Sequence, residues 1–263
     1  MSLTGKTKAS TYIDILQMNN SNSGIDTNTR NVVDGEGTVS AIALSDDELI
    51  VKAQNDDSTR AFRVVDKDDN ILLSVDSAND LVKAGIGQHI VNTQVKEFGL
   101  YSFSPTAGVH NPMIASNMMF SDSGIDIIED TSMFGNGADP ATSLDLSVNG
   151  TPSTMVACAW YLPNNITIDE VRVIGTCASS HNLNFHIYGY TLNTSTNPGD
   201  LSTGVLLAHA GAVLGTTNTT VKTSTLTLDN PDVSANQVIF AFVENESGTG
   251  DVTCQCIIKY HLR

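Results

Sequence analysis

Short apolar stretches separated by clusters of Asp, Asn and Gly run along the chain. Between residues 61 and 85, apolar and polar positions alternate in three short runs, with acidic clusters at 66–70 and 76–80. Period-two alternation is typical of a half-buried strand, and Asp and Asn favour turns. The segment therefore predicts a three-stranded meander with one apolar face, too small to bury that face alone. The apolar positions expected on this face are Phe62, Val64, Ile71, Leu73, Val75 and Val82.

The first 60 residues mix one helical pattern with strand patterns. Residues 10–18 predict a short helix with a capping Ser or Thr and an apolar stripe of Tyr12, Ile15 and Leu16. The Asn- and Ser-rich run 19–24 would end it. Residues 29–34 predict a strand, and 41–45 with 49–53 predict a hairpin.

Residues 151–263 predict an all-β domain. Seven strand patterns recur with Gly, Asn and Pro between them, which is typical of a β-sandwich or jelly roll. They lie at 155–161, 166–174, 183–190, 205–213, 221–228, 237–243 and 252–260. The pattern breaks near Asp169, which predicts a β-bulge. The run 237–243 is apolar on both faces, so it should be a central strand or lie at a subunit contact.

Residues 101–150 predict a transition segment rich in Gly, Pro and Met. Its acids run from Asp122 to Asp139, but they lack the spacing and central Gly of an EF-hand loop. Scattered acids are usually solvated, and the methionines are best explained as filling gaps at a subunit contact. No metal site is therefore expected.

The negative net charge of the chain limits which kinds of molecule it can bind. The 263 residues carry a formal net charge of −16, which disfavours binding to nucleic acid or to anionic membranes. No leader and no apolar run of membrane-spanning length is visible, so we expect a protein made in a cytosol that does not insert into a membrane. Cys254 and Cys256 would share one face of a strand and pack as small hydrophobes, like Cys158 and Cys177.

Motifs for catalysis are missing from the sequence. It contains no nucleophile elbow, no phosphate-binding loop and no paired metal-ligating histidines, and its six histidines are scattered. We therefore expect neither enzymatic activity nor a cofactor. Tyr188 and Tyr190 share one face of a predicted strand and are candidates for stacking on a glycan. Trp160 is expected to fill the sandwich core.

Three stretches resemble bacteriophage fibre and spike proteins. The meander resembles the stem repeat of these fibres, in which three chains wind into a β-prism. An N-terminal block resembles the virion-docking segment of marine phage appendages, and residues 162–168 resemble the start of a distal jelly roll. The stem match rests on Phe62, Val64, Asp66, Asn70, Leu73, Val75, Asp76, Ser77, Asn79, Val82 and Gly85, and the N-terminal match on residues 11–16, 19–24, 34–38 and 40–45.

The resemblance implies a homotrimeric virion appendage, namely a fibre, a spike or a head decoration, made in the host cytoplasm. Residues 1–60 would attach it to other virion proteins, 61–100 would form the trimeric stem, 101–150 the transition, and 151–263 a sandwich that contacts host surface glycans. Tyr12, Ile15 and Leu16 would then lie in the attachment segment. A monomeric carbohydrate-binding or adhesive β-protein is the alternative. A depolymerase spike is a third reading, but it usually needs a long β-helix that this chain is too short to form.

Overall fold

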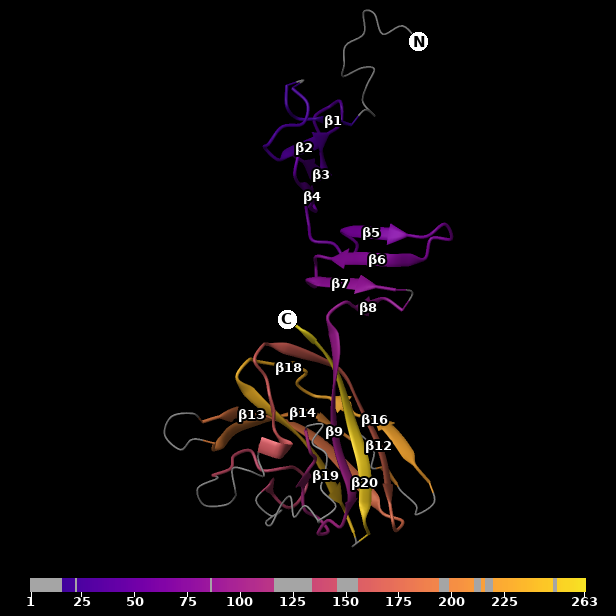
Figure 1. Cartoon of the computed structure of the whole chain (residues 1–263), viewed down its shortest axis with the longest axis vertical. Coiled ribbons are helices and arrows are strands. Elements are labelled where there is room, and N and C mark those ends of the chain that lie inside the picture. The colour runs from indigo at the N-terminus through magenta and orange to yellow at the C-terminus, as the bar shows by residue number, and fades with distance from the viewer. Residues whose placement is uncertain are drawn as a thin grey trace, which may run out of the picture. The chain divides into compact units, whose positions relative to one another are not determined.

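The computed structural model describes residues 16–21, 23–85, 87–115, 134–145, 156–193, 199–210, 214–215, 220–247 and 250–263. Within these ranges the chain is built almost entirely of antiparallel strands (Figure 1), and helical residues occur only at 134 and 156–158. The expected all-β fold class is confirmed. The chain divides into two compact units, Met1–Val91 and Asn92–Arg263.

The first sheet of the N-terminal unit is a four-stranded meander. Its strands are β1 (Gln17–Met18), β2 (Arg30–Val33), β3 (Val39–Leu44) and β4 (Leu49–Val51), paired in sequence order. The hairpin expected near residues 41–53 is confirmed, with Ile42 opposite Val51. The helix expected over 10–18 is wrong at its end, because Gln17 and Met18 pair with β2; its residues 10–15 lie outside the described part. Pairing with β2 outweighs an apolar stripe of only two turns.

The second sheet of this unit is the meander expected from the alternation. It comprises β5 (Phe62–Val65), β6 (Ile71–Asp76), β7 (Leu81–Ala84) and an additional short strand, β8 (His89–Ile90). The acidic clusters form the turns: the Asp66 side chain accepts hydrogen bonds from the backbone N–H groups of Asp68 and Asn70, at 2.8 and 2.9 Å. Asp69 and Asp80 adopt φ values of +62° and +54°, the left-handed geometry that Asp tolerates.

The C-terminal unit is a sandwich of two antiparallel sheets. The five-stranded sheet has the order β16-β12-β20-β9, with β18 also paired to β12. The seven-stranded sheet has the order β10-β19-β13-β14-β17, with β11 paired to β19 and β15 to β13. The first sheet comprises β9 (Thr93–Phe103), β12 (Ile166–Cys177), β16 (Lys222–Thr225), β18 (Asp232–Val233) and β20 (Val252–Leu262). The second comprises β10 (Asn111–Pro112), β11 (Trp160–Tyr161), β13 (Asn182–Leu192), β14 (Leu201–His209), β15 (Leu214–Gly215), β17 (Thr227–Leu228) and β19 (Gln237–Asn245).

The sandwich begins earlier in the chain than the sequence suggested. β9 pairs with β20 from Thr93 to Phe103, and its Phe98 and Leu100 are buried in the core between the sheets. Residues 92–100 therefore belong to the sandwich and not to the stem, and 101–115 and 134–145 pack onto it rather than forming a separate transition segment. The pairing partner of β9 lies some 150 residues away, so local alternation gave no sign of it.

Two cores share the seven-stranded sheet. The first core, between the sheets, takes Phe185, Ile187 and Ile239, whereas the second core lies on the other face and takes Phe240 and Phe242. This confirms that 237–243 is a central strand buried on both faces. The bulge expected near Asp169 is confirmed by a register shift between Ile168 and Glu170. The four cysteines are free and buried, as expected.

Candidate functional site: an apolar face on the N-terminal unit

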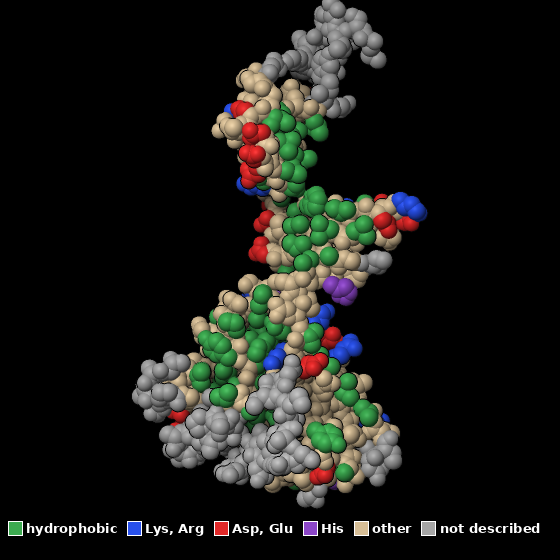
Figure 2. Space-filling view, viewed as in Figure 1, with side chains coloured by type: hydrophobic (Ala, Val, Ile, Leu, Met, Phe, Trp, Pro, Cys, Tyr) green, Lys and Arg blue, Asp and Glu red, His purple; other side chains and the backbone are tan. Residues whose placement is uncertain are grey.

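The N-terminal unit exposes most of its apolar side chains. In its described residues only Val32 and Val33 are buried hydrophobics, and both core clusters contain only residues from Phe98 onward. Hydrophobic side chains gather over β3–β4 and over β5–β7, with acidic side chains grouped beside them (Figure 2). The exposed ones are Leu16, Ile25, Val39, Ile42, Leu49, Ile50, Val51, Phe62, Val64, Val65, Leu72, Val82 and Val91.

Strand register brings the six expected stem residues onto one face of the β5–β8 sheet. Phe62 lies opposite Val75, which lies opposite Val82, and Val64 lies opposite Leu73. Paired residues project to the same side of an antiparallel sheet, as do residues two apart on one strand, such as Ile71, Leu73 and Val75. We call Phe62, Val64, Ile71, Leu73, Val75 and Val82 the apolar face. Phe62, Val64 and Val82 remain 38%, 41% and 42% exposed.

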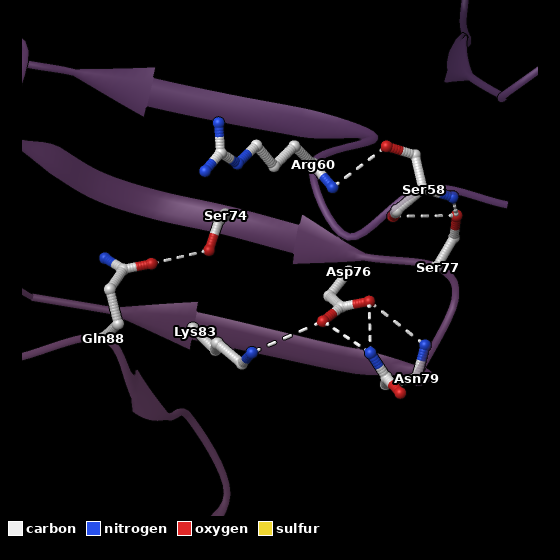
Figure 3. Close-up of polar contacts among 8 residues, drawn as sticks. All are labelled: Ser58, Arg60, Ser74, Asp76, Ser77, Asn79, Lys83 and Gln88. Carbon is white, nitrogen blue, oxygen red and sulfur yellow. Dashed lines mark hydrogen bonds and ion pairs between the residues drawn. The ribbon is translucent and has the colours of Figure 1, made fainter.

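The opposite face of the same sheet carries polar groups that are satisfied within the chain (Figure 3). Ser74, which is buried, donates to Gln88 Oε1 at 2.7 Å, and Gln88 Nε2 donates to the carbonyl oxygens of Ile71 and Gly85. The loop after β7 therefore folds over this face. The polar face thus has partners within the chain, whereas Phe62, Val64 and Val82 of the apolar face remain 38–42% exposed.

Asp76 anchors the turn between β6 and β7. It is buried, accepts hydrogen bonds from the Asn79 backbone and side chain at 3.0–3.1 Å, and pairs with Lys83 at 3.3 Å (Figure 3). The hydrogen bonds from Asn79, with a smaller contribution from Lys83, hold the pKa of the Asp76 carboxyl below its usual value. These contacts fix the spacing of β6 and β7 and hence the shape of the apolar face.

The first sheet carries a smaller apolar cluster on its hairpin. Ile42 lies opposite Val51 and Leu44 opposite Leu49, so the four side chains share a face. Leu49 is 62% exposed. Of the expected attachment residues, Leu16 precedes β1 and is also 62% exposed, whereas Tyr12 and Ile15 lie outside the described residues.

The expected glycan contacts are placed in the second core. Tyr188 and Tyr190 are 5% and 1% exposed, and the Tyr190 hydroxyl donates to the carbonyl of Ala141 at 2.7 Å. This corrects the expectation that the two rings present a stacking surface. Their strand is buried on both faces because residues 134–145 cover the side that the alternation suggested was exposed. Trp160 packs against the first core, beside Tyr260.

A cluster that sequence reasoning missed lies where residues 134–145 meet the sandwich. His110 and His186 are in ring contact, with centroids 5.0 Å apart, and His110 Nε2 lies 3.9 Å from Glu244. His186 and Glu244 also line a surface pocket of about 420 Å³, together with Asn184 and Glu246. The histidines are 76 positions apart in the chain, and no local motif signals their meeting.

The described part of the chain shows neither a grouping of metal ligands nor a membrane-spanning helix. Among the residues that the structure describes, no three His, Cys, Asp or Glu side chains are grouped so that they could hold a metal ion. Most of the acid-rich stretch that begins at Asp122 lies outside these residues. Within the same part of the chain, no helix has the length and hydrophobicity needed to cross a bilayer.

No protein-family profile and no curated protein sequence matches the chain. Among solved structures, it is similar to a chain of the infectious bursal disease virus Gx strain, with 7% identity and a TM-score of 0.26, over 68% of this chain and 34% of that one. It is also similar to a chain of desmodium yellow mottle tymovirus, with 11% identity and a TM-score of 0.23, over 65% and 85% of the two chains. The chain thus spans about a third of the length of the bursal disease virus chain. At such TM-scores neither likeness carries an argument about function.

Proposed function

We propose that this protein is a structural component of a virus particle, a homotrimeric bacteriophage appendage whose chains associate through the apolar face. The observation that carries the proposal is the exposure of that face: six apolar side chains form cross-strand rows, and three of them are 38–42% exposed. A four-stranded sheet with one uncovered apolar face needs a partner for stability. In this proposal the partner is two further copies of the same chain.

Identical copies suit this face for electrostatic reasons. The chain carries a net charge of −16, so copies repel unless their charges are kept away from the contact. The apolar face contains no charged residue, and Arg63 and Lys83 lie on the opposite face, in register with Ser74. A threefold contact through the six apolar side chains would therefore bury no charge, and it matches the stem resemblance of the same residues.

The remaining parts of the chain take their roles from the same resemblance. Residues before the meander, including Leu16 and the β3–β4 hairpin, would attach the trimer to other virion proteins, and the sandwich would be displayed. We assign the protein no catalytic role, cofactor, nucleic-acid partner or membrane insertion. The alternative of a monomeric carbohydrate-binding protein loses its named contacts, because Tyr188 and Tyr190 are buried.

Light scattering on the purified full chain tests the proposal. A trimer has three times the 27.9 kDa chain mass and should persist at micromolar concentration. A species that stays at the mass of one chain would refute self-association. Electron microscopy of virions from a host that expresses the labelled protein then tests whether the trimer is a virion component. Virions without label would overturn the assignment to the virion and leave the trimer untouched.

A further inference from the structure

Residues 134–145, which we call the strap, cover the outer face of the seven-stranded sheet. Phe134 packs against Phe240 and Phe242, with ring centroids 5.7 and 5.2 Å apart. Leu144 pairs with Leu201 through backbone hydrogen bonds in both directions, at 2.7 and 2.8 Å. The strap thereby closes the second core, whose aromatic side chains would otherwise face solvent.

The first half of the strap is held next to the two histidines. The His110 backbone N–H donates to the Gly135 carbonyl at 3.3 Å, and His110 Nδ1 lies 3.2 Å from the same oxygen. His186 Nε2 lies 3.5 Å from Asp139. His110 is fully buried and His186 is 8% exposed, so this end of the strap rests on two buried imidazole rings that contact each other.

Three carboxylates lie around His186: Asp139 at 3.5 Å, and Glu244 and Glu246, which line the same pocket as His186. The Nδ1 atom of His186 has no hydrogen-bond partner. Asp139 is the nearest carboxylate, but its side chain is 56% exposed, so solvent screens its attraction. On the neighbouring strand, His209 is already paired with Asp229 at 2.7 Å.

His110 opposes a charge on His186 more directly. The Nδ1 atom of His110 lies 3.2 Å from the Gly135 carbonyl oxygen and its Nε2 lies 3.9 Å from Glu244 without a hydrogen bond, so neither ring nitrogen of His110 accepts a proton from His186. Burial, and next the nearby His110, lower the pKa of His186 to about 4. A protonated His186 is therefore tolerated poorly while the strap is closed.

We propose that the strap is an acid-sensitive latch, in which protonation of His186 beside His110 releases residues 134–139 and opens the second core while the first core stays closed. The pKa of His186 is about 4 while the strap is closed, and it returns to its ordinary value of 6.5 when the strap is released. Protonation of His186 therefore favours the released state. The free energy that favours the closed state is thus largest above pH 6.5 and decreases as the pH falls. The opening equilibrium should rise by up to tenfold per pH unit, and by about 160-fold between neutral pH and pH 4.

Hydrogen exchange on the full chain measures the opening. The reporters are the amide of Ala141, which donates to the Phe134 carbonyl at 2.6 Å, and that of His110, which donates to the Gly135 carbonyl at 3.3 Å. Their exchange, corrected for intrinsic rate, should accelerate between pH 6.5 and 4, with increased binding of a hydrophobic dye and recovery at neutral pH. Trp160 is the single tryptophan and packs against the first core, so its fluorescence should stay constant.

Two variants assign the effect to His186. His186→Phe should keep the reporter amides protected down to pH 4. His261→Gln is the matched control, because His261 is also 8% exposed but has its own carboxylate partner, Asp169, at 2.9 Å; it should open as the wild type does. Opening that persists in His186→Phe overturns the proposal. Reporter amides that stay protected in the wild type at pH 4 also overturn the proposal. So does a change in Trp160 fluorescence that accompanies the increase in dye binding. Both measurements use the wild-type protein alone.

Discussion

Placing one charge on the apolar face should separate the proposed trimer. Val64 lies on β5, is 41% exposed and projects from the apolar face opposite Leu73. Because it is already partly in water, Val64→Asp should leave the isolated chain folded, at a cost within the roughly 1 kcal/mol span of β-propensity. In the trimer, the same carboxylate would be buried beside two others.

The exposed fractions of the six side chains set the free energy that the apolar face gains when a partner buries it. Complete burial of a Val, Leu, Ile or Phe side chain stabilises by about 2 kcal/mol. Phe62, Val64 and Val82, at 38–42% exposure, therefore retain about 0.8 kcal/mol each for a partner, and the more buried Ile71, Leu73 and Val75 about half of that. The face sums to roughly 3.5 kcal/mol per chain and about 10 kcal/mol per trimer. A trimer that persists at micromolar concentration needs about 16 kcal/mol, so other exposed apolar side chains of the unit, such as Leu49 and Val51, would have to supply the remainder. Burying an unpaired carboxylate costs about 3 kcal/mol or more per copy, so three copies cancel the gain.

Leu72→Asp is the matched control. Leu72 is 43% exposed, lies on the neighbouring strand and belongs to the polar face, so the substitution adds the same charge away from the proposed contact. Light scattering at micromolar concentration and physiological salt should show one chain mass for Val64→Asp and three for Leu72→Asp, with both circular dichroism spectra unchanged. A trimeric Val64→Asp, or equal dissociation of both variants, would show that the apolar face is not the interface.

Other residues give further tests of the structure. Phe240→Ala, at a fully buried position in the second core, should lower the free energy of unfolding by about 3–5 kcal/mol; a denaturant midpoint unchanged from wild type would contradict the second core. Hydrogen bonds hold the pKa of Asp76 below its usual value, so the exchange protection of the Asn79 amide should be complete near neutral pH and be lost as acid protonates the carboxylate. Asp76→Asn should remove that pH dependence, and an unchanged acid transition would contradict the assignment. Burial raises the pKa of Cys158 and Cys254 to about 12, so both should resist thiol reagents at pH 8 until the chain unfolds; mass spectrometry showing rapid labelling of the native protein would contradict their burial.

Local pattern sufficed for the strands whose environment is set by near neighbours. The meander at 62–84 was predictable because alternation fixes the faces of Phe62 and Val75, while Asp66 and Asp80 fix the turns through short-range hydrogen bonds and left-handed geometry. The bulge near Asp169 was visible for the same reason, since an extra residue breaks the alternation at the place where it is inserted.

Tertiary structure decided which faces are covered and where the sandwich begins. Alternation marks a strand as having two sides, but whether a second layer covers the polar-looking side depends on distant segments. The strap buries Tyr188 and Tyr190 in this way, next to the contact between His186 and His110. β9 belongs to the sandwich because it pairs with β20, which lies at the other end of the domain sequence. Burial is a property of the whole fold, because water is excluded from a side chain by every segment packed on it and not only by its neighbours in sequence.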